Sequence, residues 1–317
     1  MAQNHAIVRT LPSVQTLGCT TVICSDKTGT LTKNEMSASN LYYFGSSLDD
    51  LVDCAIDDTT YNPVGKIHID NKHKEDYKDL LLDIAKVATV NNNSSIKYAD
   101  GNFTKYGAPT EVALKVLAEK IGALYFKFDN YEENPCQYHD SLGLVKEGIL
   151  EFESNRKMMS TVVANFVPGQ AKSLLQKGAT ERLLDKCSTV SLGNGKEVIL
   201  DARAREGIMK RVNEIASKGL RCIGLAVIYN GGVLGKMTDK NKNELLSDFK
   251  KYKEYETGGT FLGFAAIKDP IREQVPDAIQ KCKEAGIRVM MITGDNKNTA
   301  EAIAREAGIL VEGQKTE

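Results

Sequence analysis

The sequence predicts an α/β protein with a parallel sheet, and three observations lead to this class. The length of 317 residues suggests about two domains. Near the start of the chain, the β-branched run Thr21–Cys24 predicts a buried strand, and Asp26 follows in a turn. Near its end, the run 287–292 predicts a second buried strand, followed by a turn at 293–295 and a helix over 298–307. Two such strand–turn units are typical of a sheet that presents both loops at one edge.

The composition excludes several classes of protein. Apolar residues make up 42% of the chain and charged residues 26%, as in ordinary globular proteins. The 41 basic and 42 acidic residues leave a net charge of −1, which argues against a nucleic-acid or anionic-membrane binder. The seven cysteines include no CxxC pair, so we expect a reducing compartment. No apolar run is long enough to cross a bilayer, and no signal peptide is found, so we expect a soluble chain.

The first predicted helix covers Leu11–Gly18, with a proline near its start and a glycine as its stop. Asp26 then stands among possible donors: the Lys27 ammonium, the hydroxyls of Thr28 and Thr30, and the N–H groups of a turn. Such donors suit an anionic phosphoryl group, and an aspartate can form an acyl-phosphate. An aspartate that merely turns the chain explains the spacing equally well.

The middle of the chain alternates short strands with helices. Helical spacing at 80–88 and 110–121 predicts two amphipathic helices, the second with Thr110 as its N-cap. The remaining expected elements are strands at 37–44, 148–152, 158–163, 174–179, 219–227 and 261–267, and helices at 206–216 and 274–285. The strands at 148–152 and 158–163 predict a hairpin with a charged tip.

The segment ICSDKTGTLT at 23–32 resembles the phosphorylation motif of the P-type ion-transporting ATPases. The resemblance implies that ATP phosphorylates Asp26, and that the Asp26 carboxylate and the Thr28 backbone carbonyl hold Mg²⁺. The haloacid-dehalogenase phosphatases share the implied fold but usually carry a second aspartate where this chain has Thr28. Without that acid/base group, we expect the phospho-aspartate to be hydrolysed slowly.

Two further segments resemble parts of the family's ATP pocket. The string GAPTEVAL at 107–114 implies that Glu111 faces the adenine, although a helix-dipole role also explains a glutamate in a first turn. The segment 152–159, which is similar to the family's F-S-x-x-R-K-x-M string, implies that Phe152 stacks on the adenine and that Lys157 lies beside the nucleotide. Calcium pumps of the family often have an arginine where this chain has Ser154, so one phosphate contact differs.

The remaining motifs imply more contacts with the nucleotide, although each also has an ordinary explanation as a turn or surface charge. The K-G-A-x-E string implies that Lys177 and the backbone at Gly178 line the pocket, and the G-L-R string implies that Arg221 reaches the phosphates. Near the end of the chain, the resemblance implies a hinge and nucleotide-side role for Asp269 and Arg272, and a phosphate-contacting loop at Thr293, Gly294 and Asp295.

The strings SVQTLGCTTVICSDKTGTLT and GIRVMMITGDNKNTAEAIAREAGI are most similar to sarco/endoplasmic-reticulum-type Ca²⁺-ATPases. The resemblance implies a haloacid-dehalogenase-like, Rossmann-like phosphorylation domain split between 1–35 and 268–317. A nucleotide-binding α+β domain built on an antiparallel sheet is inserted at 36–267. The family's later G-D-G-x-N-D loop is absent, so we expect a truncated phosphorylation domain that phosphorylates Asp26 weakly by itself.

The resemblance therefore implies the cytosolic catalytic fragment of an ATP-driven Ca²⁺ pump. Its cofactors would be ATP and Mg²⁺, its transported ion Ca²⁺ and its host membrane the endoplasmic reticulum, and the fragment would be monomeric. A soluble phosphatase of the haloacid-dehalogenase type and a non-catalytic ATP-binding module are the alternatives. Thr28 argues against the first, and titration with ATP tests the second.

Overall fold

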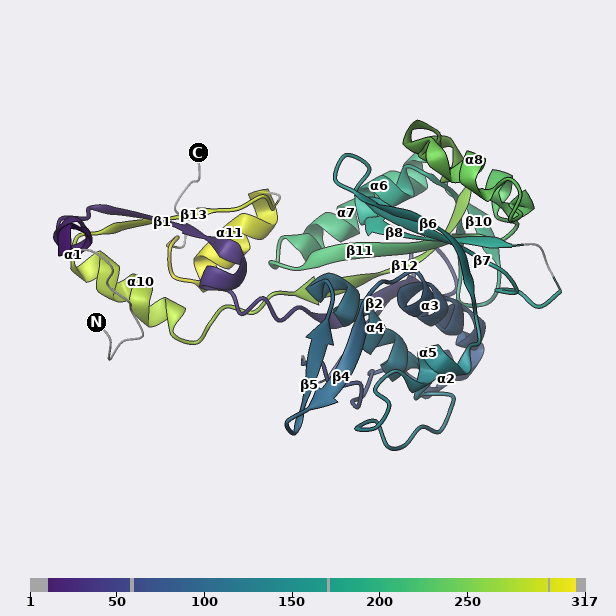
Figure 1. Ribbon diagram of the computed structural model, residues 1–317, viewed down its shortest axis with the longest axis horizontal. Coiled ribbons are helices and arrows are strands. Elements are labelled where there is room, and N and C mark those ends of the chain that lie inside the picture. Colours follow the sequence, from purple (N-terminus) through teal and green to yellow (C-terminus); the bar gives the residue numbers. More distant parts are fainter. Residues whose placement is uncertain (1–10, 58–59, 170–171, 296, 312–317) are drawn as a thin grey trace. The chain divides into compact units, whose positions relative to one another are not determined.

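The computed structural model describes residues 11–57, 60–169, 172–295 and 297–311 (Figure 1). The chain divides into two compact units. Unit 1 combines Met1–Asn34 with Asp269–Glu317, and unit 2 is the continuous segment Glu35–Lys268. Residues 1–10, which belong to the predicted N-terminal part of the phosphorylation domain, lie outside the described residues.

Unit 1 is built on a parallel pair of strands, as the sequence predicts. Strand β1 (Val22–Asp26) pairs with β13 (Arg288–Ile292), and Asp26 lies opposite Ile292 in the register. The helices of this unit are α1 (Leu11–Gly18), α10 (Val275–Glu284) and α11 (Lys297–Glu306). Its core joins Leu31, Val275, Ile279 and Ala307.

The prediction that both strands of unit 1 are buried is wrong on one face of the pair. Side chains alternate between exposed and partly buried along both strands. Val289 and Met291 pack against the small core, whereas Met290 and Ile292 are 39% and 58% exposed. An apolar run of five or six residues does not reveal how many faces of a strand are covered, because its period carries no such signal.

Unit 2 is built on a nine-stranded sheet that is antiparallel at every pairing except that of β9 with β12. The order β10-β9-β12-β11-β8-β7-β6 forms the main path, and β2 and β3 extend it from β12. The strands are β2 (Ser37–Phe44), β3 (Leu51–Ala55), β6 (Lys146–Glu153), β7 (Met158–Val163), β8 (Ser173–Ala179), β9 (Cys187–Ser191), β10 (Glu197–Ile199), β11 (Arg221–Ile228) and β12 (Gly259–Lys268). This arrangement confirms the predicted antiparallel sheet.

Helices cover both faces of this sheet, α3 and α4 on one and α6 and α7 on the other (Figure 1). Along β12, Ala265 and Ile267 join the core under α3 and α4, whereas Phe264 and Ala266 join the core under α7. The helices and single helical turns of unit 2 are α2 (Asn71–Asp76), α3 (Lys78–Val90), α4 (Pro109–Gly122), α5 (Gln137–Ser141), α6 (Thr180–Leu184), α7 (Ala202–Ala216), η3 (Gly232–Lys236), α8 (Lys242–Ser247), η4 (Phe249–Lys251) and α9 (Tyr252–Tyr255).

A separate hairpin of β4 (Ser95–Ala99) and β5 (Asn102–Tyr106) packs beside α4. In the described ranges, no helix combines the length and the apolar character that a membrane span requires.

The start of α4 corrects one prediction. Ala108 occupies the N-cap position and Pro109 the first helical position, so Thr110 is not the N-cap. A proline fits the first turn because its fixed φ suits the helix and its missing N–H would lack a partner there. The Thr110 hydroxyl instead lies 3.0 Å from the Met36 sulfur.

Candidate functional site

Asp26 stands at the exposed end of β1 and begins a tight turn in unit 1. Thr28 has φ −74° and ψ 122°, and Gly29 has φ 76° and ψ −10°, which are the angles of a type II turn. Such a turn needs a positive φ at its third residue, and glycine adopts this angle without strain. The Gly29 N–H donates to the Thr32 hydroxyl at 3.2 Å, which closes the loop behind Asp26.

The Lys27 side chain is buried and joins the Asp26 turn to the loop after β13. Its Nζ lies 2.7 Å from Asp295 Oδ2 and 3.7 Å from Asp269 Oδ2, and the residue is only 2% exposed. The sequence analysis expects this ammonium among the donors around Asp26. The structure directs it into ion pairs with two other carboxylates, and the burial of Lys27 and Asp269 strengthens the attraction between them.

Asp269 and Arg272 both brace the same turn. The Asp269 carboxylate accepts hydrogen bonds from the Thr32 hydroxyl at 2.8 Å and the Asn34 N–H at 3.1 Å. The Arg272 guanidinium donates to the Gly29 carbonyl at 2.9 Å. These contacts tie the two chain segments of unit 1 together, and they leave the expected nucleotide contacts of Asp269 and Arg272 as predictions.

The Thr293–Asp295 loop begins where β13 ends, and a hydrogen bond between residues two positions apart holds its backbone. The Thr293 hydroxyl accepts from the Asp295 N–H at 3.2 Å, and Gly294 between them is exposed. Because Asp26 pairs in register with Ile292, the Asp26 turn and this loop leave the sheet at the same edge. The parallel pair therefore presents a carboxylate and a polar loop side by side.

The oxygen atoms of Asp26 and Thr28 are of the kind that could hold a magnesium ion. In the described part of the chain, no three or more His, Cys, Asp or Glu residues gather as a metal cluster. The exposed Asp26 carboxylate and the Thr28 carbonyl are oxygen ligands, which Mg²⁺ prefers. Mg²⁺ commonly takes only one or two protein carboxylates and completes its shell with water and phosphate oxygens.

In unit 2, Lys177 and Glu111 form an ion pair in which the lysine is buried. Lys177 lies on β8 and Glu111 in the first turn of α4, and Lys177 Nζ is 2.5 Å from Glu111 Oε1. Burial lowers the pKa of Lys177 to about 8, against the opposing attraction of Glu111. The helix-dipole interpretation of Glu111 is therefore incomplete, because its carboxylate also neutralises a lysine that is 7% exposed.

More charged and polar groups surround this pair. The Asn93 N–H lies 3.4 Å from Glu111 Oε1, and its side-chain amide donates to Glu151 at 3.2 Å. Lys115, one turn further along α4, is only 3% exposed, and burial lowers its pKa. Burial also lowers the pKa of Lys146, whose ammonium contacts the Asn92 carbonyl. Acceptors and cations therefore meet at one place in unit 2.

The β6–β7 hairpin carries the two residues expected next to the nucleotide. Phe152 is 60% exposed and belongs to none of the hydrophobic clusters of the described residues. Lys157 is exposed and has φ 52°, and its N–H donates to the Glu153 carbonyl at 2.7 Å. A solvated aromatic side chain at a hairpin tip has an open face on which a planar ligand can stack.

Gly178 allows β8 to approach this hairpin closely. A Cβ atom at position 178 would lie 2.4 Å from the Lys157 carbonyl oxygen and 3.0 Å from Met158 Cα. The Ala179 N–H donates to the same Lys157 carbonyl at 3.0 Å. The structure thus brings Lys157 next to Gly178, and Glu111 next to Lys177. Arg221 is half-buried at the start of β11, 3.8 Å from the Met36 sulfur.

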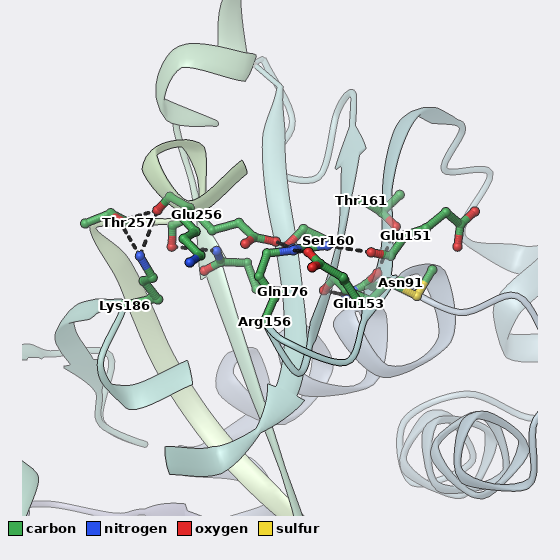
Figure 2. Close-up of polar contacts among 12 residues, drawn as sticks. Asn91, Glu151, Glu153, Arg156, Ser160, Thr161, Gln176, Lys186, Glu256 and Thr257 are labelled. Atoms are coloured by element: carbon green, nitrogen blue, oxygen red, sulfur yellow. Dashed lines mark hydrogen bonds and ion pairs between the residues drawn. The ribbon is translucent and has the colours of Figure 1, made fainter. Parts of the chain in front are cut away.

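Two residues next to the hairpin turn, Arg156 and Glu256, were not predicted from the sequence. Arg156, which it assigns to a charged tip, is 6% exposed and forms an ion pair with Glu256 (Figure 2). Glu256 is fully buried, although it stands in a lysine- and glutamate-rich segment. The one local signal is the pair of tyrosines at 252 and 255, which pack in the same core cluster.

Comparisons with known proteins agree with these motifs. A family model described as P-type ATPase, cytoplasmic domain N, matches residues 80–274. The chain is 41% identical to "Calcium-transporting ATPase 2, endoplasmic reticulum-type" of Arabidopsis thaliana, covering 99% of this chain and 31% of that protein. It is 38% identical to "Calcium-transporting ATPase 4, endoplasmic reticulum-type" of the same plant (98% and 29%) and 37% identical to "Endoplasmic reticulum calcium ATPase srcA" of Aspergillus fumigatus (99% and 33%). The chain spans about a third of the length of these relatives.

Proposed function

The chain belongs to the P-type ATPase family, and we propose that unit 2 binds ATP and that Asp26 of unit 1 accepts its γ-phosphate. The observation that carries the proposal is the ion pair of buried Lys177 with Glu111, together with Gly178, which follows Lys177 in the chain. A carboxylate there can accept from the adenine amino group, and the lysine adds positive charge for the nucleotide. Phe152 would stack on the base, while Lys157 and Arg221 would face the phosphates.

The proposed chemistry in unit 1 is transfer of a phosphoryl group to a carboxylate. An Asp26 carboxylate oxygen attacks the γ-phosphorus, a new O–P bond forms, and the bond to the β-phosphate oxygen breaks, which releases ADP. The Lys27–Asp295 pair holds the neighbouring loop, so that Thr293 and Gly294 can contact the phosphate. Mg²⁺, held by Asp26 and Thr28, would neutralise part of the charge on the phosphate oxygens.

For the whole protein, we propose an ATP-driven Ca²⁺ pump of the endoplasmic reticulum membrane. The support is the names of the relatives, which are Ca²⁺-transporting ATPases of endoplasmic-reticulum type. Thr28 also supports a pump over a phosphatase, because it leaves the phospho-aspartate without a nearby acid/base carboxylate.

Titration of the chain with ATP tests the binding site. We expect Phe152→Ala and Lys157→Ala each to weaken ATP binding by about tenfold, the usual scale of a lost base stack or phosphate contact. Lys210→Ala, which removes an exposed lysine from α7, is the matched control and should bind like the parent. Parental affinity in both pocket variants would show that the pocket lies elsewhere.

Labelling of a full-length protein that contains this chain tests the acceptor. After incubation with γ-labelled ATP and Mg²⁺, we expect acid-stable label that hydroxylamine removes, as an acyl-phosphate requires. Asp26→Asn should abolish the label. Label that persists in this variant would contradict the assignment of Asp26.

A further inference from the structure

We propose that Arg156 is a positioning residue for nucleotide binding, acting through Glu256 and the hairpin backbone to hold Phe152 and Lys157 in place. This inference rests on the ATP site proposed above and names a device beneath it. Arg156 itself is buried, so it acts on the nucleotide only through its neighbours.

Strand β6 carries a β-bulge at Phe152. In the pairing of β6 with β7, Glu151 and Phe152 together oppose the single residue Met159. A bulge of this kind bends the strand, re-aims a side chain and leaves backbone groups without partners in the ladder. The Arg156 guanidinium donates to the Glu151 carbonyl at 2.5 Å, so it satisfies a backbone group inside the bulge.

The second step is the reach of this one guanidinium. The guanidinium contacts Glu151, the residue before Phe152. The backbone of Arg156 leads directly into Lys157, so this side chain links the two ends of the turn that carries Phe152 and Lys157. Its Nε lies 3.4 Å from the Glu153 carboxylate, and its Cζ lies 5.2 Å from the centre of the Tyr252 ring. A planar side chain with five donors suits such a multiple contact, whereas a lysine cannot reproduce it.

The third step is the contact of the Arg156 guanidinium with Glu256 (Figure 2). Glu256 pairs with Arg156 through Oε1, which also accepts from the Ser160 hydroxyl at 2.7 Å. Its backbone carbonyl accepts from the Gln176 amide at 2.9 Å. In the described part of the chain, Glu256 Oε2 has no hydrogen-bond partner. Without Arg156, the fully buried Glu256 carboxylate would keep only the hydrogen bond from the Ser160 hydroxyl.

A double-mutant cycle on the full 317-residue chain tests this inference. The measured quantity is the dissociation constant for ATP by calorimetry, with circular dichroism to confirm that each variant is folded at the temperature used. We expect Arg156→Met and Phe152→Ala each to weaken binding by about tenfold. Because Arg156 acts partly by placing Phe152, the double variant should lose clearly less than the hundredfold or so that independent effects would give.

Three further variants complete the test. Glu256→Gln keeps the shape and the Ser160 contact but removes the charge, and it should weaken ATP binding in the same direction as Arg156→Met. Arg156→Lys, which keeps the charge, should restore only part of the affinity. Arg205→Met, which removes a half-buried arginine on α7, is the matched control and should leave the affinity unchanged.

The outcomes separate the two proposals. If the parent chain does not bind ATP, the proposed function fails, and this inference fails with it. If the parent binds ATP and folded Glu256→Gln and Arg156→Lys bind equally well, the positioning role alone is overturned. Losses that multiply in the double variant also overturn it, since Arg156 would then act independently of Phe152.

Discussion

Lys177 is a buried charge at the proposed ATP site, and its burial changes both its pKa and its ability to bind an anion. Its ammonium is buried on β8 and neutralised by Glu111, yet desolvation still lowers its pKa to about 8. A cation held in this way is charged near neutral pH and is less hydrated than a surface lysine. It is therefore ready to interact with an anion at little further desolvation cost.

The lowered pKa of Lys177 predicts a pH-dependent difference in stability between the parent and Lys177→Met. Between pH 8 and 10.5 the unfolded chain keeps the Lys177 proton that the folded chain has lost. The free energy of unfolding of the parent therefore rises with pH in this window relative to the variant. Denaturant titrations of both proteins at several pH values measure the difference, and parallel curves would contradict the prediction.

Gly178 predicts a second effect at the scale of a single residue. Gly178→Ala places a methyl group 2.4 Å from the Lys157 carbonyl oxygen in the β6–β7 turn, and we expect it to lower the free energy of unfolding by about 1–3 kcal/mol. Gly207→Ala is the control, because open space surrounds this glycine inside α7. There we expect a gain of about 0.5–1 kcal/mol. Thermal unfolding of both variants checks the opposite signs, and a loss at both positions would contradict the argument.

Local patterns predicted the turn after Asp26, because a glycine between hydroxyl residues has few other uses. They could not predict the partners of Lys27, since Asp269 and Asp295 lie more than two hundred positions away. The burial of Arg156 could not be predicted for the same reason, because its partner Glu256 lies in the distant segment between β11 and β12. Contacts over such separations depend on the fold and leave no mark in local sequence.

At the scale of elements, α4 carries a stripe of charge formed by Glu111, Lys115 and Glu119 at four-residue spacing, of which Lys115 and Glu119 are buried. Glu119 is fully buried and accepts from the N–H groups of Tyr138 and His139 at the start of α5, at 2.8 and 3.0 Å. Burial raises the pKa of Glu119 to about 7 and lowers that of His139 to about 4. The junction between α4 and α5 is therefore sensitive to protons.

The α4–α5 junction predicts that Glu119→Gln changes the pH profile of stability. Between pH 4.5 and 7 the folded chain holds the Glu119 proton more tightly than the unfolded chain, so this group lowers stability as pH rises. His139 acts in the opposite direction between pH 4 and 6.5, because only the unfolded chain is protonated there. Glu119→Gln should leave the His139 effect alone, and stability should climb more steeply over this range. An unchanged profile in denaturant titrations would contradict it.

Periodicity predicted the strongest elements and missed the weakest. Helices α3 and α4, the β6–β7 hairpin and the strands β8, β11 and β12 all occur where apolar spacing indicated them. Strand β3 was missed because it is short, flanked by polar residues, and forms only through its register with β2. The contrast shows that an edge strand depends on its partner more than on its own pattern.

At the scale of the whole molecule, unit 2 is one uninterrupted segment with its own cores on both faces of a sheet. We therefore expect residues 35–268 alone to fold cooperatively and to bind ATP, because every proposed adenine and Lys177 contact lies within them. Calorimetry and thermal unfolding of this segment measure both properties. A segment that remains unfolded, or that folds without binding ATP while the full chain binds it, would contradict the expectation.

The motifs at both ends predicted the parallel pairing of β1 with β13, since each strand precedes a polar loop. The exposed face of that pair was not predicted, because neither strand's sequence records what covers it. Family membership could be predicted from the motifs because they are long, and a ten-residue match such as 23–32 seldom arises by chance.

The two ends of unit 2 lie next to each other. Ser37 at the start of β2 and Lys268 at the end of β12 are register partners, and in unit 1 the Asn34 N–H bonds to Asp269. The chain therefore enters and leaves unit 2 at neighbouring points. An inserted segment whose two ends lie close together can be exchanged or enlarged during evolution while the fold of unit 1 stays the same.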